Sequence, residues 1–233
     1  MNQVKAKISS KRYIYIKSRD EKFSLDNNFY AINWFNTKFG WMYNLYGLLV
    51  GRLLLKSGGR LRFKGSITKV LKGDDQRKRD TLLIVKYPSG NVFKSIVEKK
   101  YFQIASLLRI NSVDKFTFGF AAKNAITPDR PTRDTQRHYG IHHFKGNDST
   151  LGLLQDPKLR DPVQIIFAGM IKANLFAGDE KEARFQVPCV MDGLIVYAAE
   201  NEMTLNHFLE SEVYQSVIET TESSFIGILK REF

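Results

Sequence analysis

Cysteine is almost absent from this chain. Cys189 is the only cysteine among 233 residues, so no disulfide can form within the molecule. A chain without disulfides is typical of a reducing compartment, and we expect the protein in the cytoplasm. Cys189 lies between Pro188 and Val190, an apolar setting that favours a small buried side chain over a nucleophile.

Long hydrophobic runs are also absent. A membrane-spanning helix needs about 18 or more uninterrupted apolar residues, whereas the closest segment, 41–55, contains Asn44 and Arg52. We therefore expect a buried amphipathic helix in that segment and no membrane partner. The first 28 residues are basic and polar, and they lack the apolar segment that defines a secretory signal.

Motifs that would hold a metal ion or a cofactor are missing as well. His138, His142 and His143 are close in sequence, but neighbouring residues of a strand point to opposite sides. No cysteine or nearby carboxylate completes a set of ligands with them. The sequence therefore predicts no metal site and no cofactor.

Acidic residues are scarce in the first part of the chain, and basic residues are scarce in the rest. Residues 1–146 contain 29 Lys and Arg against 10 Asp and Glu, while residues 147–233 contain 7 against 14. The basic first half could bind nucleic acid or another polyanion, but no segment matches the aromatic and basic RNP motifs. Opposite charges also favour contact between the two halves, so nucleic-acid binding remains an alternative only.

The chain does contain a repeated strand. The segment 30–35 reads Tyr-Ala-Ile-Asn-Trp-Phe, and the segment 139–144 reads Tyr-Gly-Ile-His-His-Phe. A repeat of about 20 to 50 residues would indicate a solenoid, but a spacing above one hundred indicates a duplicated domain. We therefore expect two domains of similar architecture.

Each copy shows the same order of elements. In the first copy, aromatic and alternating patterns predict strands and the helical period predicts helices, in the order strand 29–35, helix 37–56, strands 60–71 and 81–87, helix 91–111 and strand 115–121. In the second copy the corresponding segments are 139–144, 149–156, 163–176, 193–198, 203–219 and 224–231. This order is the βαββαβ arrangement of ferredoxin-like domains.

The domain boundaries follow from these elements. We predict a basic extension over 1–28, a first ferredoxin-like domain over 29–121, a linker over 122–137 and a second, divergent domain over 138–233. The fold class is α+β. The linker contains prolines and arginines without an apolar period.

Four segments of the first copy resemble a known family. Residues 56–61, 70–74, 83–89 and 97–103 are similar to segments of the DUF1330 proteins of the dimeric α/β-barrel superfamily, and residues 208–215 repeat the last of them. The resemblance implies two antiparallel sheets that meet face to face as a barrel, here within one chain. Pairing between molecules, as a homo-oligomer, is the alternative.

The resemblance also implies a function. Barrel interiors of this superfamily often bind small, largely apolar molecules, so we expect a small-molecule ligand. The superfamily includes cofactor-independent enzymes, so chemistry on an aromatic or polyketide-like compound is an alternative.

Candidate site residues come from the repeated strand. Asn33 aligns with His142 and Trp34 aligns with His143, and alternation places one of these pairs on the inner face of the barrel. We favour Asn33 and His142, because Ala31 and Gly140 leave space beside them.

The favoured histidine has two interpretations. His142 could act as an acid, a base or a ligand-binding group, because imidazole titrates near neutral pH. It could equally be a hydrogen-bonded structural histidine. Arg62, Tyr87 and Tyr197 complete the candidate ligand-binding set, with a solvated arginine and core tyrosines as the structural alternatives.

Overall fold

The computed structural model describes residues 4–8, 12–18, 28–73, 79–123, 127–128, 138–153, 163–177 and 191–232. The elements of the first half are β3 (Phe29–Thr37), α1 (Gly40–Lys56), β4 (Arg60–Lys72), β5 (Thr81–Tyr87), α2 (Gly90–Val97), α3 (Lys100–Ser112) and β6 (Val113–Lys123). Those of the second half are β7 (His138–Lys145), α4 (Asp148–Leu153), β8 (Gln164–Ala177), β9 (Gly193–Ala199), α7 (Glu202–Glu210), α8 (Glu212–Glu219) and β10 (Ser223–Arg231).

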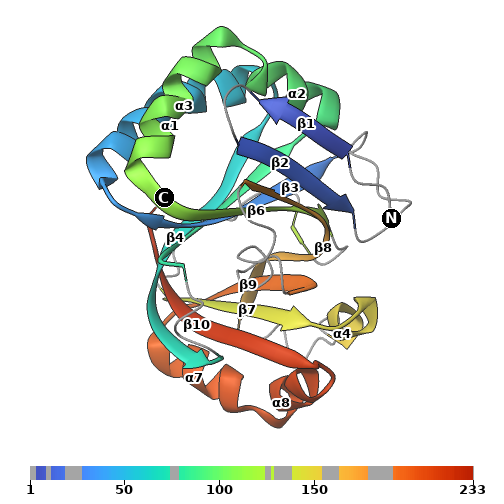
Figure 1. Ribbon diagram of the computed structural model, residues 1–233. Coiled ribbons are helices and arrows are strands. Elements are labelled where there is room, and N and C mark those ends of the chain that lie inside the picture. The colour runs from blue at the N-terminus through green and yellow to red at the C-terminus, as the bar shows by residue number, and fades with distance from the viewer. Residues whose placement is uncertain are drawn as a thin grey trace.

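Eight antiparallel strands close into a barrel between two helical layers (Figure 1). The order is β8-β6-β3-β5-β4-β10-β7-β9, and β9 also pairs with β8. If the strands of each half are numbered along the chain, both halves show the spatial order 4-1-3-2, which is the ferredoxin-like order. The expected α+β fold with an intrachain barrel is confirmed.

The two halves also share their strand register. Asn33 lies opposite Leu83 in the pair of β3 and β5, and His142 lies opposite Ile195 in the pair of β7 and β9. β4 has one extra, bulged residue at Arg62, and β8 has one at Ile166. On the partner strands, β5 and β9, the bulges lie one to two residues after Leu83 and Ile195. The two halves therefore share one architecture, while the tandem duplication and its boundaries at 29–121 and 138–233 stay predictions.

The barrel interior is a packed apolar core. All eight strands contribute to one cluster of buried side chains, which includes Tyr30, Ile32, Trp34, Phe63, Ile67, Leu82, Ile84, Ala121, Tyr139, Ile141, Phe167, Ile171, Leu194, Val196, Phe225 and Leu229. An eight-stranded barrel has an interior about as wide as its own side chains. Two further clusters fill the spaces between the sheet and the helices of each half.

The structure departs from the predicted elements at three places. The helix expected over 91–111 is interrupted after Val97, and the helix expected over 203–219 is interrupted at Ser211. Within the predicted extension, β1 (Val4–Ile8) and β2 (Arg12–Ser18) form a hairpin that pairs with β8. β8 is longer than β9, which pairs only with residues 164–170. β2 pairs with the remaining edge of β8, at residues 173–177.

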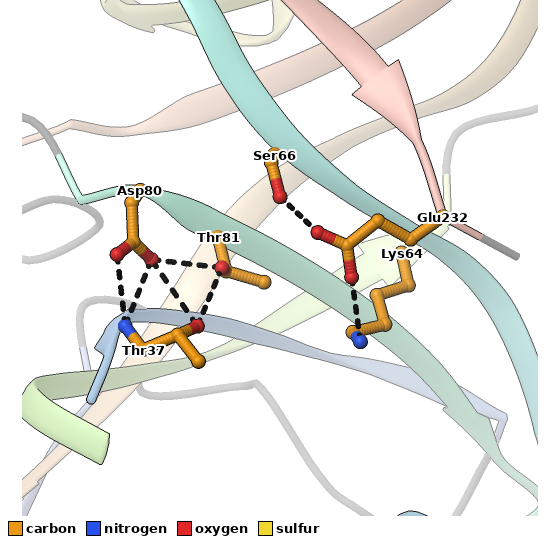
Figure 2. A network of polar contacts seen from close by, with 6 residues as sticks. All are labelled: Thr37, Lys64, Ser66, Asp80, Thr81 and Glu232. Carbon is orange, nitrogen blue, oxygen red and sulfur yellow. Dashed lines mark hydrogen bonds and ion pairs between the residues drawn. The ribbon is translucent and has the colours of Figure 1, made fainter. Parts of the chain in front are cut away.

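Glu232, just after β10, connects the two halves where β10 meets β4 (Figure 2). Its carboxylate lies 2.6 Å from the Lys64 ammonium and accepts a hydrogen bond from the Ser66 hydroxyl. Burial alone would raise the pKa of Glu232, but the hydrogen bonds from Lys64 and Ser66 outweigh it and lower the pKa below its usual value.

A second set of polar contacts joins the end of β3 to the start of β5 (Figure 2). The Asp80 carboxylate accepts hydrogen bonds from the Thr37 amide at 2.8 and 3.0 Å and from the Thr81 hydroxyl at 2.8 Å. These bonds satisfy a backbone donor at a strand end, and we assign them a structural role.

Candidate functional site

Trp34 and His143 meet inside the barrel. The indole Nε1 donates a hydrogen bond of 2.7 Å to His143 Nε2, and His143 Nδ1 lies 3.0 Å from the carbonyl of Gly193. Because a carbonyl can only accept, Nδ1 must carry the proton of the imidazole. Both ring nitrogens of His143 are therefore hydrogen-bonded, and we assign the pair a structural role in the core.

The expectation that Asn33 and His142 face the barrel interior is wrong. Trp34 and His143 point inward, so alternation turns Asn33 and His142 toward the helices. The prediction relied on the space that Gly140 leaves beside His142. That space lies on the helix side of the sheet, where the ring of Tyr197 fills it. A Cβ built on Gly140 would lie 2.2 Å from Tyr197 Cε2.

His142 lies between the sheet of the second half and helix α8. Its side chain is fully buried, and its ring centroid is 5.5 Å from that of Phe144 and 5.7 Å from that of Tyr214. Burial is the main cause, and together with electrostatic interaction with His143 and Lys72 it lowers the pKa of His142 to about 3. The imidazole is therefore neutral at physiological pH.

A chain of hydrogen bonds fixes the tautomer of His142. The Thr221 hydroxyl donates to the carbonyl of Ile218 at 2.6 Å, so it accepts the bond of 2.8 Å from Ser224. Ser224 then has no second proton and accepts from His142 Nε2 at 2.9 Å. The proton is on Nε2, and the buried Nδ1 is an acceptor with no hydrogen-bond partner among the described residues.

Two tyrosines lie in the same layer. Tyr197 on β9 and Tyr214 on α8 are fully buried, and their hydroxyls are hydrogen-bonded to each other. Burial raises the pKa of both phenols far above the ordinary value, so both are neutral. Phe208 packs against both rings, at centroid distances of 5.2 and 4.7 Å. His142, Tyr197, Phe208 and Tyr214 form an aromatic layer, here called the α8 layer.

Asn33 and Tyr87 lie in the first half. Asn33 Nδ2 is 3.3 Å from the carbonyl of Ala31 and 3.2 Å from that of Leu83, so its amide is bonded within the sheet. Tyr87 stacks on Phe29 with ring centroids 5.5 Å apart, and burial raises the pKa of its phenol. Neither residue approaches the α8 layer through these contacts.

Arg62 occupies the bulge of β4. Its guanidinium is buried and donates to the carbonyl of Pro128. The expectation of a solvated strand position is therefore wrong for this arginine. Of the five residues predicted from the sequence, the structure brings only His142 and Tyr197 together, through their shared neighbour Tyr214.

Sequence reasoning missed Tyr214, Ser224 and Thr221 as site residues. Tyr214 follows the helical period of α8 with Val217 and Ile218, which gives it the pattern of a core residue. Ser224 is 82 residues from His142 in sequence, and only the register of β10 against β7 brings them together. No short motif could have shown this contact.

Metal-ligating side chains do not gather in the described part of the chain: it contains no group of three or more His, Cys, Asp and Glu able to hold a metal ion. His142 and His143 point to opposite faces of β7, as strand alternation predicts. Cys189 lies outside the described residues.

Comparison with known proteins gives similarity at the level of the fold. No family model matches the chain, and no curated protein matches it in sequence. A candidate monooxygenase of Fusobacterium nucleatum is 5% identical, with a TM-score of 0.55 over 88% of this chain and 93% of its own. An anthrone oxidase-like protein is 12% identical, with a TM-score of 0.52 over 94% of both chains.

A candidate monooxygenase of Lactobacillus acidophilus has a TM-score of 0.49 and 8% identity, over 89% of this chain and 95% of its own. The Fusobacterium nucleatum structure and the anthrone oxidase-like structure have the dimeric α/β-barrel fold, in agreement with the strand order found here. The protein therefore has the dimeric α/β-barrel fold, built within a single chain.

Proposed function

We propose that the protein binds a small, largely apolar molecule that carries a hydrogen-bond donor, within the α8 layer. The observation that supports this proposal is Nδ1 of His142, a buried acceptor without a donor among the described residues. Leaving such a group unsatisfied costs about 1–3 kcal/mol, and an O–H or N–H of a ligand would recover that cost. The surrounding aromatic rings suit an apolar body.

The proposed site differs from the barrel interior that the sequence favours. The interior contains an apolar cluster from all eight strands, whereas the α8 layer combines apolar rings with one unused acceptor. Ligand pockets are typically apolar with a few placed polar groups. The resemblance of residues 56–61, 83–89 and 97–103 to DUF1330 proteins also supports small-molecule binding, and DUF1330 membership is a prediction.

The second candidate is a cofactor-independent enzyme acting on an aromatic or polyketide-like compound. Two fold neighbours are named as a candidate monooxygenase and an anthrone oxidase-like protein. His142 would be the base, but a pKa of about 3 is unfavourable for taking a proton from a phenol. A phenol has a pKa of about 10, so the transfer is uphill by roughly seven pKa units. Hydrogen-bond acceptance at Nδ1 has no such cost, which favours binding.

Imidazole ¹⁵N NMR with two small probes tests the binding proposal. Phenol and toluene have similar size, but only phenol has a donor. Phenol should shift the Nδ1 resonance of His142 and bind more tightly than toluene by about tenfold, as expected for one satisfied buried acceptor.

Two variants control this experiment. His142→Phe keeps an aromatic ring without the acceptor and should remove the preference for phenol. Asn33→Leu changes the equivalent position of the first half and should leave the preference unchanged. Equal binding of both probes by the wild-type protein, or no binding of either, would contradict the proposal.

A further inference from the structure

Exposed apolar side chains concentrate on one face of the molecule. Helices α1 and α3 present a set of large side chains to solvent, here called the α1–α3 face: Trp41, Leu45, Leu48, Leu55, Tyr101, Ile104, Leu107 and Ile110. Trp41 is 67% exposed, Leu48 61% and Ile104 60%. The two helices pack side by side, and Tyr101 Oη donates to the carbonyl of Leu49. These side chains therefore belong to one continuous surface.

The exposed side of α1 lies opposite its buried side. Tyr43 and Leu54 are buried against the sheet, while Trp41, Leu48 and Leu55 recur at helical spacing on the other side. A helix with large apolar side chains on two opposite sides favours a second apolar environment besides the core. Contiguous exposed apolar surface of this kind marks a contact with a protein or a membrane.

Cations predominate on the helices around this face, and Glu98, at the C-cap of α2, is paired with Lys94 at 3.8 Å. The helices of the first half, α1, α2 and α3, contain Arg52, Lys56, Lys94, Lys100 and Arg109 and no Asp or Glu. The helices of the second half show the reverse, with Asp148, Glu202, Glu210, Glu212 and Glu219 and no Lys or Arg. The two helical layers lie on opposite sides of the barrel (Figure 1). The described helices therefore make one side cationic and apolar and the other side anionic.

We propose that the α1–α3 face docks on an anionic lipid surface. Leucines and Trp41 would enter the interface between headgroups and acyl chains, and Arg52 and Lys56 would contact lipid phosphates. Each cation near an anionic leaflet strengthens binding by about fivefold. The acidic helices on the opposite side would be repelled, which sets the orientation of the bound molecule.

The charge pattern disfavours a second copy as the occupant. Arg52 follows Leu48 by one helical turn in the exposed stripe of α1, so a symmetric dimer through this face would bring like charges together. Head-to-tail pairing would satisfy the charges, but α7 exposes only Met203 among its large apolar side chains. Neither arrangement gives the apolar face a complementary surface.

Docking on a bilayer does not require a spanning segment. None of the helices in the described residues combines the length and the apolar character that crossing a membrane requires. The proposal concerns attachment to a surface, and it replaces the expectation from the sequence that no membrane is involved. A nucleic acid would match the cations but not the exposed leucines.

Vesicle binding of the full chain tests the proposal, with tryptophan emission as the readout. Trp41 is exposed, whereas Trp34 is buried in the barrel, so a blue shift would report the α1–α3 face. Mixed phosphatidylcholine and phosphatidylglycerol vesicles should bind the protein and shift the emission. Pure phosphatidylcholine should bind it about tenfold more weakly or less, and added salt should weaken the binding to the mixed vesicles.

Two single substitutions of matched exposure locate the contact. Leu48→Glu places a carboxylate in the α1–α3 face and should lower partitioning by about tenfold, because it removes an apolar group and adds repulsion. Met203→Glu changes a side chain that is 66% exposed on α7 and should leave partitioning unchanged. Circular dichroism confirms that both variants fold.

Three results would overturn the proposal. The first is the same vesicle binding by wild type and Leu48→Glu. The second is no vesicle binding together with a concentration-dependent dimer in analytical ultracentrifugation that Leu48→Glu dissociates, which would assign the face to a second copy. The third is salt-sensitive binding of a duplex oligonucleotide without binding to the mixed vesicles, which would assign the cations to nucleic acid.

Discussion

Trp34 donates a hydrogen bond of 2.7 Å to His143, and the two residues occupy equivalent positions in the two halves of the barrel. Trp34 lies opposite Leu82 on β5, and His143 lies opposite Leu194 on β9. Two tryptophans at these positions would offer two donors and no acceptor. Because the two halves have different residues here, one side chain donates and the other accepts, and the contact is a hydrogen bond.

Replacing the donor should destabilise the barrel. Trp34→Phe keeps an aromatic ring but removes the indole N–H and leaves Nε2 of His143 buried without its donor. We expect the free energy of unfolding to fall by at least about 1–3 kcal/mol, because an unsatisfied buried acceptor retains its full desolvation cost and the smaller ring adds a cavity. Urea denaturation followed by circular dichroism measures the change.

The other tryptophan provides the control for this measurement. Trp41 is exposed, so Trp41→Phe should change the free energy of unfolding by less than about 0.5 kcal/mol. Equal stabilities of the two variants would mean that the indole hydrogen bond contributes nothing to folding.

Acid should weaken the fold through His142. Its pKa is about 3 in the folded protein and near 6.5 in the unfolded chain. Between these values the unfolded chain binds one more proton, so stability falls as the pH is lowered through 6.5 toward 3. At about pH 5 the loss from this residue should be roughly 2 kcal/mol relative to neutral pH.

A comparison of variants isolates that contribution. His142→Phe removes the titrating group and should show a smaller loss of stability between about pH 7.5 and pH 5. Asn33→Leu, at the equivalent strand position, should follow the wild-type profile. Parallel profiles for the wild type and His142→Phe would show that His142 is not held neutral by burial.

The barrel could be predicted from the sequence because its signals are local and repeated. The matching segments 30–35 and 139–144 set the period, and apolar alternation located the strands on each side of them. The faces of those strands could not be predicted. Both sides of β3 and β7 are buried, so alternation carries no amphipathic signal that would separate the inner side from the outer side.

The helix interruptions and the site depend on tertiary contacts. Lys99 begins α3 in an extended conformation with no proline or glycine to indicate a break, and the helical period continues through it. The α8 layer joins His142 to side chains from β9, α7 and α8. The candidate histidine was therefore visible in the sequence, while its partners and its orientation were not.

The close contact between Gly140 and Tyr197 predicts a strong effect of one methyl group. In Gly140→Ala the Cβ would lie 2.2 Å from Tyr197 Cε2, so the ring must move out of the α8 layer. We expect a loss of about 1–3 kcal/mol in the free energy of unfolding, as for other overpacked sites. Thermal or urea denaturation measures it.

Gly47 offers a matched control on α1. A Cβ there would meet nothing within 4 Å, so Gly47→Ala should stabilise the protein by about 0.5–1 kcal/mol through helix propensity. If Gly140→Ala proves as stable as the wild type, Tyr197 does not pack in the position described here.

Glu232 should stabilise the contact between the halves in a pH-dependent way. Its pKa is lowered in the folded protein, so its contribution is present above the unfolded value near 4.3 and is lost as the pH falls through the folded value. The side chain is 34% exposed, so Glu232→Gln should cost only about 0.2–1 kcal/mol at neutral pH. Urea denaturation of both proteins at neutral pH and at about pH 3 should show the difference shrinking in acid.

Glu222 is the matched control, because the two glutamates share their backbone geometry. The amide of each glutamate donates to the carbonyl of its lysine partner at 2.9 Å, and each ion pair has an N–O distance of 2.6 Å. The Glu222 side chain is 67% exposed, so solvent screens its pair with Lys145 more strongly. Glu222→Gln should therefore cost less than Glu232→Gln at neutral pH. If the two variants lose the same stability, burial of the Glu232 pair does not strengthen it, and the contact between β10 and β4 depends on the strand hydrogen bonds alone.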